Sequence, residues 1–190
     1  MADTGAPHFI PFAEPTDLVR DWPALSEDVA DAVAAGLSAA GGLVAVKHVL
    51  KTDTFVSGSV AGGDNVAVPD LEITHEVADA NNRLIITALL GQRSSNVGAT
   101  GIAVHDGTNF IAIGDAAGSR VRVSSGFSVN TQAIANFVHT PGTGSKTYTV
   151  RLFNINQTSG TLFVNRLPDD ADNAANARYV SSLIIQEVKV

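Results

Sequence analysis

Residues 147–155 read TYTVRLFNI, a run whose first six residues alternate strictly between polar and apolar side chains. Successive side chains of a β-strand point to opposite faces of a sheet. A period of two therefore predicts a strand with one buried face. This assignment also determines what the loop before the run can do.

The preceding loop, HTPGTGSK (139–146), resembles a phosphate-binding P-loop in composition. A P-loop has the pattern GxxxxGK[ST] and leads from a strand into a helix, whose N-terminus holds the phosphate. Here Ser145 precedes the lysine, and Thr140 stands where the first glycine is required. Because the next segment is predicted to be a strand, we expect a loop between two strands and no nucleotide site.

The two-residue period recurs through most of the chain after Leu43, and turn-forming clusters of Gly, Asn, Asp, Ser and Pro separate the runs. Asp106-Gly107 lies between two apolar runs and predicts a hairpin. Without a helix-length segment among the runs, the pattern predicts a mainly β fold, an antiparallel jelly roll or β-sandwich of about 8–10 strands. The expected strands are 43–50, 71–78, 83–90, 100–107, 109–115, 119–129, 133–140, 147–155, 161–166 and 179–190.

Residues 1–23 have a different character, because they hold four of the seven prolines. Proline at this density blocks a regular helix or a central strand. The segment also contains apolar side chains that a solvated linker does not require: Phe9, Ile10, Phe12, Leu18 and Trp22. We predict an extended arm that docks onto another surface. The alternative is an unstructured tail.

A short helix is predicted within residues 24–42, which end at Gly41-Gly42. Its apolar residues recur at every fourth position and would share one face: Leu25, Val29, Val33 and Leu37. A helix of about 15 residues is marginal alone in water. We therefore expect it to pack on its own domain or on copies of itself. The predicted organisation is an arm (1–23), an acidic helix with a glycine-rich hinge (24–42) and a β domain (43–190).

The net charge of −7 argues against a dedicated nucleic-acid binder, which needs a basic surface. Residues 1–42 contain seven acidic residues and one basic residue, whereas the rest of the chain is nearly neutral. No cysteine is present, so disulfides and thiolate sites are excluded. We see no apolar run long enough to span a bilayer and no secretory leader, and expect a soluble protein.

Three patterns resemble catalytic or metal-binding sites without matching one. HEVAD (75–79) has Asp79 where the HExxH zinc motif needs its second histidine, and on a strand the two side chains would lie about 13 Å apart. His105-Asp106 has no serine in a GxSxG context to complete a triad. The acidic loop PDDADN (168–173) lacks the EF-hand pattern. We expect no cofactor, no metal and no enzymatic activity.

Several segments together resemble the tumour-necrosis-factor-like jelly-roll domains of tailed-bacteriophage virion proteins, such as fibres, spikes and capsid appendages. The segments are RLIITALLGQRSS (83–95), IAVHDGTNFIAIGD (102–115), FVHTPGTGSKTYTVRLFNINQTSGTLFVNR (137–166) and ARYVSSLIIQEVKV (177–190). Residues 11–37 resemble the helix-bearing segments that precede such domains. The sequence has no collagen-like or coiled-coil shaft, which favours a short spike or knob.

This resemblance implies a homotrimer, and two expected strands are compatible with one because they are apolar on both faces. In 83–90, Leu84, Ile86 and Leu89 oppose Ile85 and Leu90, and in 179–190, Leu183 and Ile185 oppose Ile184 and Val188. We assign the trimer interface to these strands, through Leu84, Ile86, Leu183 and Ile185. Which face of the jelly roll meets the partner stays open.

The function implied by the resemblance is that of a non-enzymatic structural protein of a bacteriophage virion. A homotrimeric fibre or spike on head or tail would be anchored through residues 1–42 to a capsid, connector or tail protein. Its jelly-roll knob would be exposed for attachment to a host-surface glycan or protein. The alternative is a free carbohydrate- or receptor-binding module. A depolymerase is disfavoured, because no pair of acids lies in a recognisable site.

Overall fold

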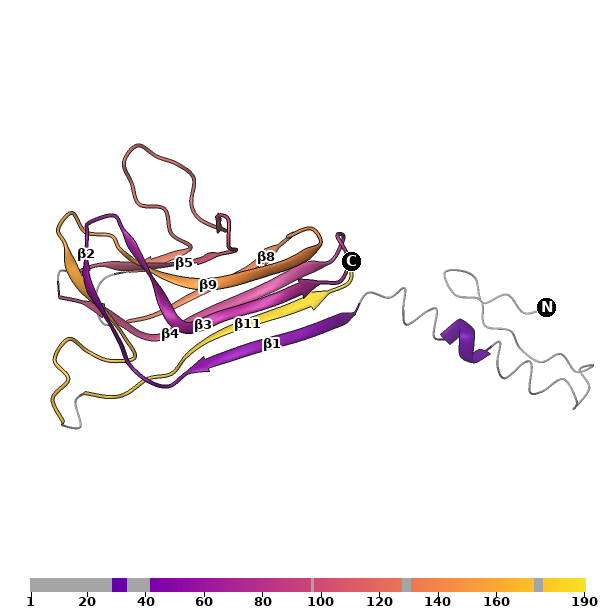
Figure 1. Cartoon of the computed structure of the whole chain (residues 1–190), viewed down its shortest axis with the longest axis horizontal. Helices are drawn as coiled ribbons and strands as arrows, with labels where there is room; N and C mark the ends of the chain where they lie inside the picture. The colour runs from indigo at the N-terminus through magenta and orange to yellow at the C-terminus, as the bar shows by residue number, and fades with distance from the viewer. Residues whose placement is uncertain (1–28, 34–41, 97, 128–130, 173–175) are drawn as a thin grey trace, which may run out of the picture. The chain divides into compact units, whose positions relative to one another are not determined.

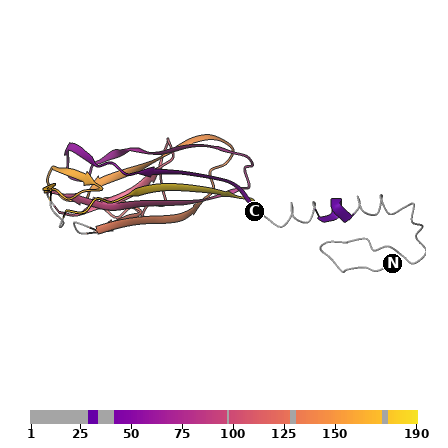
Figure 2. The same cartoon turned by 90° about the horizontal axis from the view of Figure 1, so that it is seen from below.

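The computed structural model describes residues 29–33, 42–96, 98–127, 131–172 and 176–190. Two antiparallel sheets lie face to face with a hydrophobic core between them, so the predicted mainly β, antiparallel sandwich is confirmed (Figures 1 and 2). The strands are β1 (Leu43–Lys51), β2 (Phe55–Val60), β3 (Asn65–Val77), β4 (Arg83–Ser95), β5 (Thr100–His105), β6 (Phe110–Ile111), β7 (Ser125–Phe127), β8 (Thr131–His139), β9 (Gly144–Asn154), β10 (Gly160–Val164) and β11 (Ser181–Val188).

Sheet A is built around β4, the strand that carries RLIITALL. Its first half pairs with β11 on one side and β8 on the other, so that Ile86 lies between Ile185 and Phe137. β1 pairs with the far edge of β11, and β10 pairs with the last residues of β4 and with β2. The sheet thus has six strands, with β1-β11-β4-β8 as its broad part.

Sheet B consists of β3, β9 and β5, with the short strands β6 and β7 both pairing with β5. TYTVRLFNI lies in β9, the central strand between β3 and β5. The strand predicted after the P-loop-like segment is therefore confirmed. The predicted hairpin at Asp106-Gly107 is also confirmed, since it joins the antiparallel strands β5 and β6 and Gly107 adopts a φ of 91°.

The core forms from the alternate positions that each sheet turns toward the other. Leu84, Ile86, Leu183 and Ile185 of sheet A are fully buried there with sheet B side chains such as Tyr148. Burying an aliphatic side chain of this size stabilises the fold by about 1.5–3 kcal/mol.

The assignment of these four residues to a trimer interface is therefore corrected. Each is fully buried within a single chain, so none has surface left for a second subunit. The trimer itself stays a prediction. The assignment of β4 residues to its two faces also changes. Strict alternation places Leu90 on the inward face with Leu84, and it places Leu89 on the outward face with Ile85.

Three expectations about individual strands were wrong. The strand expected at 109–115 is reduced to Phe110–Ile111. β2, with the sequence FVSGSV, was missed because serine and glycine interrupt its apolar pattern. Most of the strand expected at 119–129 belongs instead to a loop over residues 112–124, and only Ser125–Phe127 is a strand among its described residues. The loop leaves the β conformation at Ala112 and Gly118, whose φ angles are 50° and 60°.

The region before β1 is described only in part. Residues 29–33 are helical and lie within the predicted helix, while the proposed docking residues Phe9, Ile10, Phe12, Leu18 and Trp22 lie outside the described residues. The sandwich, Leu43–Val188, is a compact unit by itself. Among the described residues, no helix has the length and hydropathy needed to cross a bilayer.

Candidate interaction surface

The outer side of sheet A carries apolar side chains across four adjacent strands. The strand register places the outward residues in three rows that run from β1 through β11 and β4 to β8. The rows are Val46, Gln186, Ile85, Val138; then His48, Ile184, Thr87, Asn136; then Leu50, Ser182, Leu89, Ile134. We define the apolar face by its seven aliphatic members: Val46, Leu50, Ile85, Leu89, Ile134, Val138 and Ile184.

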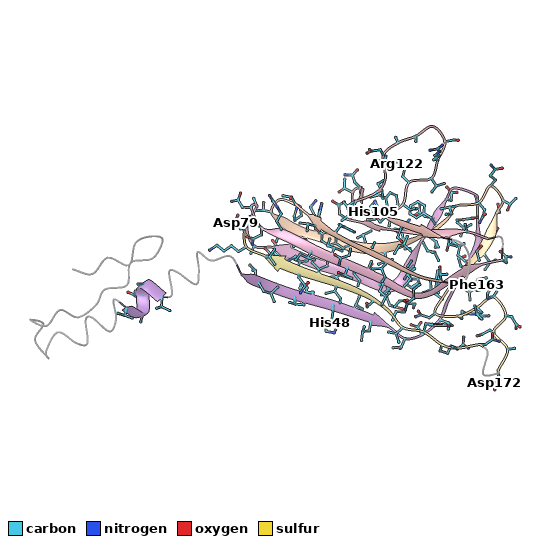
Figure 3. All side chains as sticks on the ribbon, turned by 180° about the vertical axis from the view of Figure 1, so that it is seen from behind. His48, Asp79, His105, Arg122, Phe163 and Asp172 are labelled. Atoms are coloured by element: carbon cyan, nitrogen blue, oxygen red, sulfur yellow. The ribbon has the colours of Figure 1, made fainter. Side chains whose placement is uncertain are left out.

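The apolar face is most exposed at its two sides. Val46 and Leu50 on β1 are 49% and 59% exposed, and Ile134 and Val138 on β8 are 56% and 65% exposed. Between them Ile85, Leu89 and Ile184 are half-buried by their neighbours. His48, labelled in Figure 3, lies in the middle row. Large exposed apolar patches that are rimmed by polar residues commonly mark sites where a protein contacts a partner.

Sheet B provides an internal comparison, because its outer side is polar. On β3 the outward residues are Glu72, Thr74 and Glu76, and on β9 they are Ser145, Thr147, Thr149 and Arg151. The Thr74 and Thr147 hydroxyls lie 2.8 Å apart, and Arg151 Nε donates to Asn65 Oδ1 at 2.8 Å. The outer positions of β3 and β9 are therefore polar, whereas seven of the twelve outward positions on sheet A are aliphatic.

The free edge of β1 is protected against strand addition. Lys47 reaches across to sheet B and donates to the Thr74 carbonyl at 2.8 Å. Lys51, almost fully buried, is held by Asp53 at 2.9 Å and Asp70 at 3.4 Å. Inward-pointing lysines on an edge strand disfavour pairing with a further strand. A partner on sheet A is thus expected to cover its face rather than extend its edge.

A buried polar pair links the two sheets near the end where β1 begins. His75 Nε2 of β3 lies 2.8 Å from Glu187 Oε2 of β11. Glu187 Oε1 accepts hydrogen bonds from Asn82 Nδ2 at 2.6 Å and from the Ala78 amide at 3.0 Å. Burial raises the pKa of Glu187, but the hydrogen bonds from Asn82, His75 and Ala78 outweigh it and hold that pKa below 4.5.

The His75–Glu187 pair offers no route to catalysis, because both side chains are almost fully buried. No group of three His, Asp or Glu side chains within the described residues could hold a metal ion. The strand on which the sequence placed His75 is confirmed. Its side chain is almost fully buried, and its partner lies 112 residues away.

A second polar group lies at the β5–β6 turn. Asp106 Oδ1 accepts from the amides of Thr108 and Asn109, and its Oδ2 lies 3.2 Å from Lys146 Nζ. Burial raises the pKa of Asp106, but these contacts outweigh it and lower the pKa to about 2. Burial of their own side chains lowers the pKa of His139 and raises that of Tyr148. The contacts of Asp106 stabilise the turn.

No protein-family model matches the chain, and no curated protein is significantly similar to it. The evidence for a function is thus the chemistry of the molecule's surfaces. The sequence singled out the two central strands of sheet A and missed the contributions of β1 and β8. The sequence did contain a signal for these two strands. Val46 and Leu50 in β1, and Ile134 and Val138 in β8, are apolar residues at the alternate positions that do not face the core.

Proposed function

We propose that this chain is a non-enzymatic structural protein that self-assembles through the apolar face of sheet A. The assembly is a homotrimer that serves as a short fibre or spike on a bacteriophage virion, anchored by residues 1–42. The apolar face is the observation that carries the proposal. The number of subunits and the virion setting rest on the sequence resemblance to phage jelly-roll domains.

Physical chemistry favours a covered sheet over a solvated one. Seven aliphatic side chains share the face, and four of them are about half or more exposed in the single chain. Removing each such side chain from water contributes roughly 1 kcal/mol at about 25 cal/mol per Å². Covering the polar outer side of sheet B would yield no comparable hydrophobic free energy. Association through sheet A is therefore preferred.

The test is the solution mass of the full-length protein, measured by light scattering at several concentrations. We expect a stable mass three times the 19.6 kDa of one chain. Val138→Lys is expected to yield monomer, because it places a charge where the apolar face meets its neighbour. Thr149→Lys is the matched control, since it adds the same charge on the outer side of sheet B opposite Glu72 and should leave the mass unchanged.

A monomer at all concentrations would contradict the proposal. So would a trimer that tolerates lysine at both Val138 and Ile134. A monomeric protein would favour the alternative function, a free binding module.

A further inference from the structure

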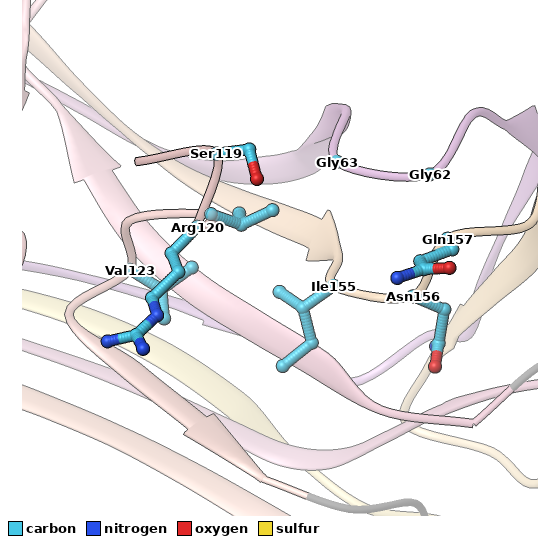
Figure 4. Close-up of a pocket in the computed structure, with 9 residues that line it drawn as sticks. Gly62, Gly63, Ser119, Arg120, Val123, Ile155, Asn156 and Gln157 are labelled. Atoms are coloured by element: carbon cyan, nitrogen blue, oxygen red, sulfur yellow. The ribbon is translucent and has the colours of Figure 1, made fainter. Parts of the chain in front are cut away.

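Three loops meet in a pocket at one end of the sandwich. The pocket is about 570 Å³ and is formed by the β2–β3 turn, the 112–124 loop and the β9–β10 turn. Its lining residues are Gly62, Gly63, Ser119, Arg120, Val121, Val123, Ile155, Asn156 and Gln157. Figure 4 shows Arg120 and Gln157 on opposite sides of Ile155. A volume in this range suits a small ligand, since such sites commonly measure about 300–1,000 Å³.

The β2–β3 and β9–β10 turns are locked together. Asn154 is fully buried, and its side-chain amide donates to the carbonyls of Val60 at 2.9 Å and Thr158 at 2.8 Å. The Gly63 amide donates to the Asn154 carbonyl at 2.8 Å. At Gly62 the turns approach so closely that an added Cβ would lie 2.6 Å from the Asn156 carbonyl oxygen.

The 112–124 loop is fixed onto sheet B by Val123. A Cβ added at Gly101 or Gly126 would meet the Val123 side chain at 2.7 Å or 3.2 Å, so Val123 sits where these glycines leave room. The Ser124 amide donates to the Ile102 carbonyl at 2.8 Å. The end of the loop at Val123 and Ser124 is thus held in place, whereas Ser119 and Arg120 lie on its exposed part. The held part of the wall lowers the conformational cost of binding a ligand.

The lining is cationic within an acidic protein. Arg120 is its one formally charged residue, and the lining contains no carboxylate, although the chain has a net charge of −7. Within the part of the chain that the structure describes, the Arg120 guanidinium has no hydrogen bond or ion pair. A guanidinium binds carboxylates with two parallel hydrogen bonds, so an anionic group is the ligand it fits best.

The other lining groups match a sugar ring. Val121, Val123 and Ile155 supply an apolar surface, while Ser119 and Gln157 supply a hydroxyl and an amide that donate and accept hydrogen bonds. Asn156 Nδ2 donates within the protein, to the Ala99 carbonyl at 2.8 Å and to Asn154 Oδ1 at 3.4 Å, so this side chain has no donor left for a ligand. A sugar presents C–H groups on its ring face and hydroxyls around its rim, which is the same division of apolar and polar surface.

We propose that this pocket binds an acidic saccharide, a sugar that carries a carboxylate, with Arg120 holding the carboxylate. This inference rests on the proposed function, a spike anchored to a virion through residues 1–42.

The chain enters the sandwich at Leu43, which pairs with Val188, whereas the pocket lies at the other end, where β3 begins. The 13 residues of β3 separate the two ends by about 40 Å. A sandwich anchored through its N-terminal side would thus present the pocket outward.

The test is saturation-transfer NMR of the full-length protein with trigalacturonic acid and with N-acetylneuraminic acid. Galactotriose is the control for a sugar without a carboxylate. A short peptide with a free C-terminal carboxylate is the control for a carboxylate without a sugar. We expect at least one acidic sugar to bind with a Kd on the order of 1 mM. Arg120→Gln should weaken that binding about tenfold or more, the value of a charged hydrogen bond.

Arg122→Gln is the matched variant, because it removes the same charge from the same loop outside the lining. Arg122 donates through Nε to the Gly114 carbonyl, a bond that a glutamine amide can replace. Its affinity for the acidic sugar should equal that of the wild type.

Three results would overturn the proposal: no binding of either acidic sugar, equal binding of galactotriose, or preferential binding of the peptide. Equal losses in Arg120→Gln and Arg122→Gln would also overturn it. All nine lining residues come from one chain, so sugar binding can be read in a monomer or a trimer. Light scattering on the same samples therefore separates a failure of this inference from a failure of self-assembly.

Discussion

Asp106 shows how one side chain can hold a turn by charge. It is buried at the β5–β6 turn, yet it accepts hydrogen bonds from two backbone amides and an ammonium group. Because these contacts favour the ionised form, its pKa falls from 3.8 to about 2. A depressed carboxyl pKa contributes stability above the unfolded-state pKa, and the contribution is lost as the pH falls through the folded-state pKa.

Asp106→Asn is expected to lower the free energy of unfolding by about 2 kcal/mol near neutral pH, which corresponds to the difference between 3.8 and about 2. Asparagine can still accept from Thr108 and Asn109, so the loss reports the charge. The difference from wild type should shrink as the pH falls from 3.8 toward 2. Urea denaturation across this range checks it, and a difference that does not change with pH would contradict the assignment.

At the scale of elements, β3 and β11 are joined through the core by more than packing. His75 and Glu187 come from different sheets and meet 2.8 Å apart, with Asn82 and Ala78 completing the bonds to the carboxylate. Breaking a buried, charge-assisted hydrogen bond leaves its partners unsatisfied. The pair therefore ties sheet A to sheet B near the end where the chain enters the sandwich.

Glu187→Gln is expected to destabilise the sandwich by about 2 kcal/mol, because His75 and two donors then share a neutral acceptor. Since the pKa of Glu187 lies below 4.5, its contribution is present above pH 4.5 and declines at lower pH. Glu76→Gln on the exposed side of β3 is the control and should change stability little. Thermal unfolding of both variants measures the effect, and equal melting temperatures would refute the role.

The element scale also shows the limit of sequence patterns. The period of two located β1, β4, β8, β9 and β11, and Asp106-Gly107 located a hairpin. It could not say which of two apolar faces in β4 lies inward, because Leu84 and Ile85 are equally apolar. That choice depends on sheet B, whose strand β3 lies before β4 and whose strands β5 and β9 follow it.

For the whole molecule, the sandwich is compact by itself from Leu43 to Val188, with a core supplied by its own two sheets. Its surfaces differ: the outer side of sheet A is apolar, the outer side of sheet B is polar, and one end carries a cationic pocket. Anchoring, assembly and recognition would then use different parts of the chain.

Deletion of residues 1–23 is expected to leave the melting temperature of the sandwich unchanged, because Leu43–Val188 is a compact unit whose two sheets supply a core to each other. It should abolish incorporation into virions, since this segment carries the proposed docking residues. Circular dichroism follows the fold, and the protein content of purified particles follows incorporation. A truncated protein that still enters particles would contradict the anchoring role of the arm.

Most of the secondary structure follows from the sequence alone, since alternation and turn residues act over a few neighbouring positions. Sequence reasoning thus reached most strands, one hairpin and the fold class, and it failed at β2 and at the 112–124 loop. Tertiary packing sets which side of sheet A faces outward, and it brings residues 62–63, 119–123 and 155–157 into one pocket. These features arise where segments far apart in the chain pack together, and the local side-chain period carries no information about such meetings.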